Sequence, residues 1–85
     1  MKGKRVFTII KTFYKNQTEV AEAINFVLDS YWVDEIKEEE MIQTIKDIIR
    51  NNDSLLYKNG DYTTIIKQRS GKRRLEIVSR IKEDL

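Results

Sequence analysis

The last third of the chain reads Tyr62-Thr-Thr-Ile-Ile-Lys-Gln-Arg-Ser-Gly-Lys-Arg-Arg-Leu-Glu-Ile-Val-Ser-Arg-Ile-Lys82. Its apolar residues keep a helical spacing, so it predicts a folded basic surface rather than a disordered tail. Glu76 is its one acidic residue. Its positively charged side chains are those of Lys67, Arg69, Lys72, Arg73, Arg74, Arg80 and Lys82.

Gly71 divides this stretch into two predicted helices. Asp61 is a favourable N-cap and the apolar residues after it continue at helical spacing, which predicts a short helix over 62–69. Gly71 fits the C′ position that ends this helix. A last helix is predicted over about 72–84, with Leu75, Val78 and Ile81 on its buried side.

The segment 53–66 allows two interpretations. Asn59-Gly60 between apolar residues is a type I′ hairpin signal, with strands near 55–58 and 61–65. We favour a turn at 58–60 followed by the helix over 62–69, and we keep the hairpin as the alternative.

Towards the N-terminus the sequence predicts two amphipathic helices. Asn16 with Glu19 three residues later resembles a capping box, with Thr18 as an alternative N-cap, and the apolar residues that follow predict a helix over 17–32. Asp34-Glu-Ile-Lys-Glu-Glu-Glu40 is predicted to open a second helix, with acidic residues in the first turn where they are favoured, and this helix is predicted to end at Asn51-Asn52. Its buried stripe is expected to be Met41, Ile42, Ile45, Ile48 and Ile49.

These elements predict one small, mainly α domain over residues 1–85, with about four short helices in a helical core over 16–85. Residues 1–15 form a basic, extended N-terminal segment in this interpretation, and 6–14 is rich in β-branched and aromatic residues, as a strand would be. Such a strand needs a partner near Leu55 or in a second copy of the chain. The expected core is Val20, Ile24, Val27, Leu28, Trp32, Ile45, Ile48, Ile49, Ile65, Leu75, Val78 and Ile81.

The composition argues against catalysis. The 85 residues contain no histidine and no cysteine, so the commonest general base, thiolate ligands and disulfides are all missing. No sequence motif brings a nucleophile, base and stabiliser together. We therefore expect a non-enzymatic, cytoplasmic protein without cofactor, metal or membrane segment, and a chain this short would gain stability as a homodimer.

The charge is strongly segregated along the chain. Residues 1–15 carry a net charge of +5, residues 16–53 a net charge of −7 and residues 54–85 a net charge of +4. One hypothesis is a nucleic-acid-binding surface of Lys67, Arg69, Lys72, Arg73, Arg74 and Arg80, with Tyr62 or Tyr57 as a stacking residue. The other interpretation is that the basic helix docks on the acidic second helix, within the monomer or across a dimer.

The alternative function is a protein-binding regulator or inhibitor of a host protein. Its candidate residues are Tyr31, Trp32, Glu35, Glu38 and Glu39, an aromatic pair beside an acidic helix start. The competing interpretations are that the two rings close the core and that the carboxylates are a solvated first turn. Glu38, Glu39 and Glu40 are consecutive, so they fan around a helix and do not converge on a metal ion.

Four stretches carry a family resemblance: Tyr14-Lys-Asn-Gln-Thr-Glu-Val-Ala21, Tyr31-Trp32, Lys58-Asn-Gly60 and Gln68-Arg-Ser-Gly-Lys-Arg-Arg-Leu75. Together they resemble a family of small uncharacterised proteins from Clostridium-like Firmicutes and their phages, over about residues 12–82. The resemblance implies a bacterial or prophage context and transfers no site residue. Residues 1–11 look additional to the family.

Overall fold

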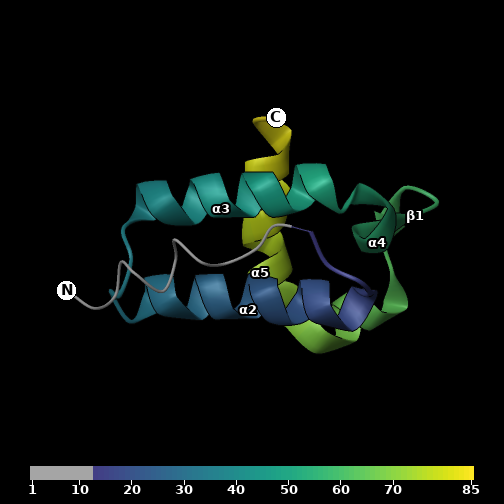
Figure 1. Ribbon diagram of the computed structural model, residues 1–85, viewed down its shortest axis with the longest axis horizontal. Helices are drawn as coiled ribbons and strands as arrows, with labels where there is room; N and C mark the ends of the chain where they lie inside the picture. The colour runs from purple at the N-terminus through teal and green to yellow at the C-terminus, as the bar shows by residue number, and fades with distance from the viewer. Residues whose placement is uncertain (1–12) are drawn as a thin grey trace.

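The computed structural model describes residues 13–85, and within them the predicted fold class, mainly α with four helices, is confirmed. The first 12 residues, which hold most of the predicted extended segment over 6–14, lie outside the described part. The elements in chain order are α2 (Gln17–Trp32), α3 (Glu38–Asn51), α4 (Asp53–Leu56), β1 (Tyr57–Lys58), β2 (Asp61–Tyr62) and α5 (Thr64–Glu83) (Figure 1).

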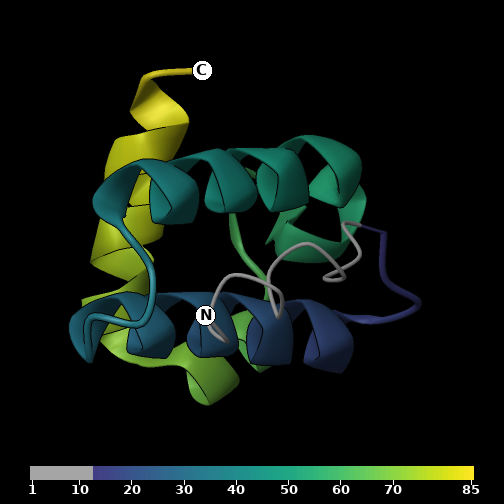
Figure 2. The ribbon, with the colours of Figure 1, turned by 60° about the vertical axis from the view of Figure 1, so that its left-hand side comes forward.

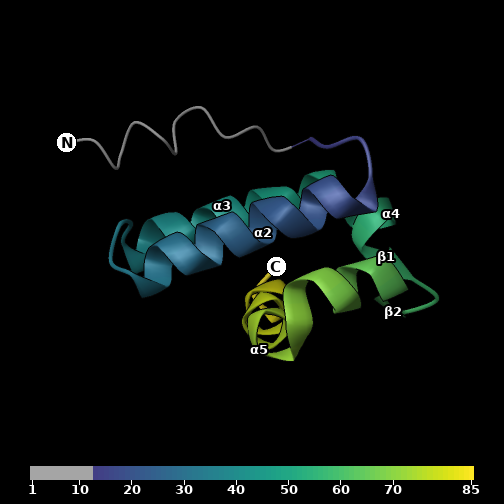
Figure 3. The same cartoon turned by 90° about the horizontal axis from the view of Figure 1, so that it is seen from below.

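Two long helices, α2 and α3, lie side by side, and the C-terminal part of α5 crosses behind both of them (Figures 1 and 2). Helix α5 packs mainly against α2, and α4 with the β1–β2 hairpin lies at one end of this pair (Figure 3). The apolar sides of the three long helices meet in one core. Its fully buried side chains include Val20, Ile24, Val27, Leu28, Ile45, Ile48, Leu56, Ile66 and Val78.

Local capping explains the limits of α2. The Asn16 side chain accepts a hydrogen bond of 2.9 Å from the Glu19 backbone N–H, as predicted. At the other end Asp34 adopts φ 64°, its N–H donates to Tyr31 O, and the Glu35 N–H donates to Ser30 O. These two bonds form a Schellman motif, which satisfies the last carbonyl groups of the helix.

The start of the second helix differs from the prediction. Asp34 serves as the C′ residue of α2, and α3 begins only at Glu38, with Lys37 as its N-cap residue. A left-handed aspartate ends one helix and so cannot open the next in the same turn. Ile36, in the loop between them, is buried in the core. The predicted end of α3 at Asn51-Asn52 is confirmed.

Segment 53–66 combines parts of both interpretations and begins with α4, a short helix that neither predicted, in place of the start of the strand near 55–58. Asn59 and Gly60 both have positive φ, at 56° and 82°, as a type I′ turn requires, and they join the two-residue strands β1 and β2. The predicted turn at 58–60 is therefore confirmed. The helix predicted over 62–69 starts two residues later than expected. Thr63, not Asp61, is its N-cap, and its side chain accepts from the Ile66 N–H.

Gly71 interrupts α5 as predicted. Its φ of 81° and ψ of 164° are not helical, so residues 64–70 and residues 72–83 form two helical segments that point in different directions (Figure 3). This backbone region is open essentially to glycine alone. The segments agree with the predicted helices over 62–69 and 72–84 to within two residues.

Two predicted core residues are wrong. Trp32 is 36% exposed at the end of α2, and Ile65 is only partly buried, whereas its neighbour Ile66 is fully buried. Because the helix starts at Thr64 and not at 62, its first turn presents Ile66 to the core. The other predicted core residues are buried, and Ile42 of the predicted stripe is partly buried.

Gly71→Ala should lower the free energy of unfolding by about 1–3 kcal/mol. No atom lies within 4 Å of the place that a Cβ would occupy, so the cost arises from the backbone conformation and not from a clash. Urea unfolding followed by circular dichroism measures it. The matched control is Lys72→Ala at the next, exposed position, expected within about 0.5 kcal/mol of wild type. Equal midpoints for Gly71→Ala and wild type would contradict this account.

Candidate functional site

The turn at Gly71 creates an open groove of about 680 Å³ on α5. Both segments of α5 contribute to it, and β2 contributes Tyr62. Positively charged side chains dominate its polar lining, with Glu76 as the one carboxylate. The lining residues are Tyr62, Lys67, Lys72, Leu75, Glu76, Ser79 and Arg80.

The structure divides the six predicted nucleic-acid-binding residues into two groups. Lys67, Lys72 and Arg80 line the groove, although they lie up to 13 positions apart in the sequence. Arg69, Arg73 and Arg74 do not line it. We call the first three residues the groove cations.

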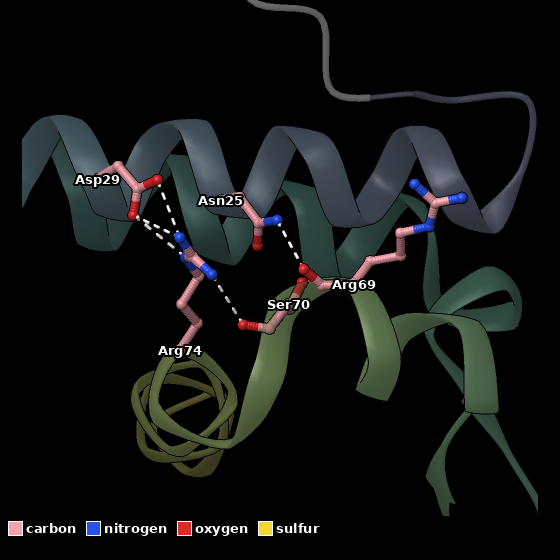
Figure 4. Close-up of polar contacts among 5 residues, drawn as sticks. All are labelled: Asn25, Asp29, Arg69, Ser70 and Arg74. Carbon is pink, nitrogen blue, oxygen red and sulfur yellow. Dashed lines mark hydrogen bonds and ion pairs between the residues drawn. The ribbon is translucent and has the colours of Figure 1, made fainter.

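Arg74 belongs to the joint between α5 and α2 (Figure 4). Its Nε and Nη2 atoms donate to both carboxylate oxygens of Asp29 at 3.0–3.1 Å, and its Nη1 donates to Ser70 O at 3.0 Å. On the other side of Ser70, the Asn25 side chain donates to Arg69 O at 3.0 Å. Both flanks of the turn at Gly71 are thus tied to α2.

The other two arginines outside the groove differ from each other. The Arg73 guanidinium lies 4.8 Å from the centroid of the Trp32 ring in a cation–π contact between two exposed side chains. The Arg69 side chain is exposed and extends towards the N-terminal half of α2 (Figure 4). Among the ion pairs of residues 13–85, α5 uses Asp29 and Asp61, so within one chain α5 contacts α3 without an ion pair to its acids.

Tyr62 is the groove residue held most firmly. Its hydroxyl group lies 2.8 Å from Ser79 Oγ and donates to Leu75 O at 3.3 Å. Its ring centroid lies 5.0 Å from that of Tyr57. The Lys82 ammonium group in turn lies 3.8 Å from the Tyr57 ring centroid, in a cation–π contact. The sequence named Tyr62 as a stacking candidate, but nothing in it indicated that Ser79 would anchor the hydroxyl group.

Lys67 is partly engaged already. Its ammonium group lies 2.6 Å from Asp61 Oδ2, and this contact, with the Tyr62 N–H, holds the pKa of the Asp61 carboxyl group below its usual range. Both side chains are more than half exposed. An exposed pair of this kind contributes little stability, so an incoming anion can compete for the ammonium group at low cost.

The alternative protein-binding residues are also divided. Tyr31 and Glu38 border a second groove of about 330 Å³, between the end of α2, the start of α3 and the end of α5. Trp32, Glu35 and Glu39 are exposed and do not line it. The remaining lining is mostly apolar and consists of Met41, Ile42, Ile77, Arg80, Ile81 and Asp84.

Residues 13–85 contain no cluster of three or more potential metal-ligating side chains. In the same range, no helix combines the length and the apolar character needed to cross a bilayer.

The Arg74–Asp29 pair should show a coupling energy of about 0.5–1 kcal/mol in a double-mutant cycle, because it is bidentate but only partly shielded from water. The exposed fractions of the two side chains are 28% and 51%. Arg74→Ala should cost more than Asp29→Ala, since it also removes the bond to Ser70 O. Urea unfolding of both single variants and the double variant measures the coupling, and strict additivity would contradict it.

Alkaline unfolding should depend on Tyr57. Burial, followed by the neighbouring Tyr62 and Asp53, raises the pKa of the Tyr57 hydroxyl group above its ordinary value of 10.0. The folded state then holds this proton more tightly than the unfolded state does. The resulting stability is fully present below about pH 10 and is lost progressively as the pH rises above it.

Tyr57→Phe should therefore flatten the fall in the free energy of unfolding between about pH 9 and about pH 11. Part of the slope should persist, because burial also raises the pKa of Tyr14. Urea titrations of wild type and variant across this range make the measurement, with about pH 7 as the reference. Parallel curves for the two proteins would contradict a role for Tyr57.

The comparisons with known proteins identify a family. A family model described as a conserved hypothetical protein matches residues 11–83, a span that includes all the helices and strands described above. No curated protein and no solved structure gives a significant match. The match confirms the resemblance to an uncharacterised family of Clostridium-like bacteria. The chain belongs to this family of conserved hypothetical proteins.

Proposed function

We propose that the protein is a non-enzymatic module that binds nucleic acid through the groove of α5. The observation that carries this proposal is the convergence of the groove cations, Lys67, Lys72 and Arg80, on one concave surface beside Tyr62. Neutralisation of backbone phosphates by lysine and arginine supplies most of the affinity in sequence-independent binding.

The local electrostatics support an anionic ligand. Lys72 begins the helical segment 72–83, and Arg73 and Arg74 follow it directly. Positive side chains in a first turn add to the partial positive charge of the helix N-terminus, and of these three Lys72 lines the groove. Among residues 13–85, Arg74 is the one of the three with a carboxylate partner, so the positive potential near this end of the helix is only partly neutralised.

A second candidate function is that of a protein-binding regulator. The specific observation is that Tyr31 and Glu38 meet at the mostly apolar second groove. A stable complex with one host protein would be weakened by Glu38→Lys and would not respond to Lys72→Glu, which lies outside that groove. Either function suits a bacterial or prophage-encoded protein of the cytoplasm, and the homodimer stays a prediction.

Reversal of two groove charges tests the main proposal. Lys72→Glu/Arg80→Glu should weaken binding to labelled oligonucleotides at least about tenfold at low salt, measured by fluorescence anisotropy. For the wild type, three phosphate contacts predict a slope of log affinity against log salt of about −2 on single strands. Both side chains are exposed, so urea unfolding should show that the variant is folded.

The matched control is Lys46→Glu/Arg69→Glu. It makes the same change in net charge at two positions outside the groove, and neither side chain takes part in an ion pair among residues 13–85. It should keep more than half of the affinity. Equal weakening by the two double variants would show that net charge, and not the groove, is what binds. Absence of wild-type binding at low salt would overturn the nucleic-acid function itself.

A further inference from the structure

Tyr62 is a fixed aromatic surface at the end of the groove. Its hydroxyl group is anchored to Ser79 and to the carbonyl group of Leu75, and its backbone pairs with Tyr57 in the hairpin. The Tyr57 ring packs beside it at 5.0 Å, with an angle of 32° between the ring planes. The Tyr62 side chain is still only partly buried and borders the groove.

A ring held in this way needs little ordering when a flat ligand stacks on it. The side-chain entropy that a free surface tyrosine would lose has already been lost on folding. Stacking of nucleobases on aromatic rings tolerates any sequence, because every base has a π face. A fixed ring beside cations is therefore a typical element of single-strand binding sites.

Glu76 indicates that more than phosphate enters the groove. A carboxylate repels phosphate, so a groove for the backbone alone has no use for it. A carboxylate does accept hydrogen bonds from the N–H groups of unpaired bases, such as N3–H of thymine and uracil or the amino group at cytosine N4. Glu76 lines the groove together with Tyr62, Lys72 and Arg80, and it has no ion pair among residues 13–85.

These observations favour one form of nucleic acid. In a duplex each base is stacked between its neighbours and paired across the helix, so no base face is free for Tyr62. An unpaired strand can place a base on the ring and the adjacent phosphates on the groove cations. We propose that the groove takes single-stranded DNA or RNA, with one unpaired base stacked on Tyr62 and flanking phosphates on Lys72 and Arg80.

This inference rests on the proposed function and goes one step further, so its test must separate the two. The cleanest probe changes the ligand and leaves the protein intact. An oligothymidylate of about ten nucleotides and an abasic strand of the same length carry the same phosphates, but the abasic strand has no bases. Wild type should bind the abasic strand about tenfold more weakly, and a duplex of the same length more weakly than the oligothymidylate.

Variants at position 62 give the matching result on the protein side. Tyr62→Leu removes the ring and should weaken binding of oligothymidylate about tenfold, with little change for the abasic strand. Tyr62→Phe keeps the ring, loses the hydroxyl anchor and should retain most of the affinity. If a urea titration shows that Tyr62→Leu does not fold, the comparison of oligothymidylate with the abasic strand on the wild-type protein tests the inference by itself.

The outcomes are distinct. Equal affinity of wild type for oligothymidylate and the abasic strand, or tighter binding of the duplex, overturns the stacking inference and leaves phosphate binding by the groove in place. Failure to bind any of the three ligands at low salt overturns the proposed function and the inference together. Oligouridylate in place of oligothymidylate distinguishes RNA from DNA, and a tenfold preference of either over its abasic form supports the inference.

Discussion

The backbone of Gly71 is the constraint on which the rest of the C-terminal half depends. Its φ of 81° and ψ of 164° turn the chain between two helical segments, a conformation that a residue with a Cβ rarely adopts. The turn has two consequences. Both flanks approach α2, where the Asn25 amide group and the Asp29 carboxylate hold them. The two segments also contribute side chains to the open groove.

The same turn separates the positive charges by role. Arg74 points towards α2, and its charge is neutralised by Asp29, so it serves the joint between the helices. Arg73 lies against Trp32, which is exposed at the end of α2. Lys72 and Arg80 face the groove instead. The basic residues of this stretch thus have three different roles. Arg74 joins two helices, Arg73 contacts a surface tryptophan, and Lys72 and Arg80 contribute to a concave positive surface.

Local sequence patterns predicted the long helices, whereas the set of residues in the groove depends on the angle between the two segments of α5. Helix α2 followed from its cap at Asn16 and its apolar spacing, because both signals lie within one element. The C′ role of Asp34 was missed because the usual signal there is a glycine. Thr63 was missed because Asp61, two residues earlier, is an equally good N-cap by type and is used instead in the hairpin. No local rule indicates that Lys67 and Arg80 line the same groove while Arg74 points towards α2, since this depends on the direction of the chain after Gly71.

The fold and the groove use almost separate sets of side chains, and this separation bears on the function. The fully buried residues are aliphatic and lie on the inner sides of the helices, whereas the groove cations are exposed and contribute little to stability. Lys72 and Arg80 have no ion pair among residues 13–85, and the exposed Lys67–Asp61 pair can open, so all three can meet an external anion. Tyr62 is the exception, because it joins the hairpin to α5 through Ser79 and also borders the groove. The interaction that secures the hairpin therefore also sets the orientation of the one aromatic ring in the groove.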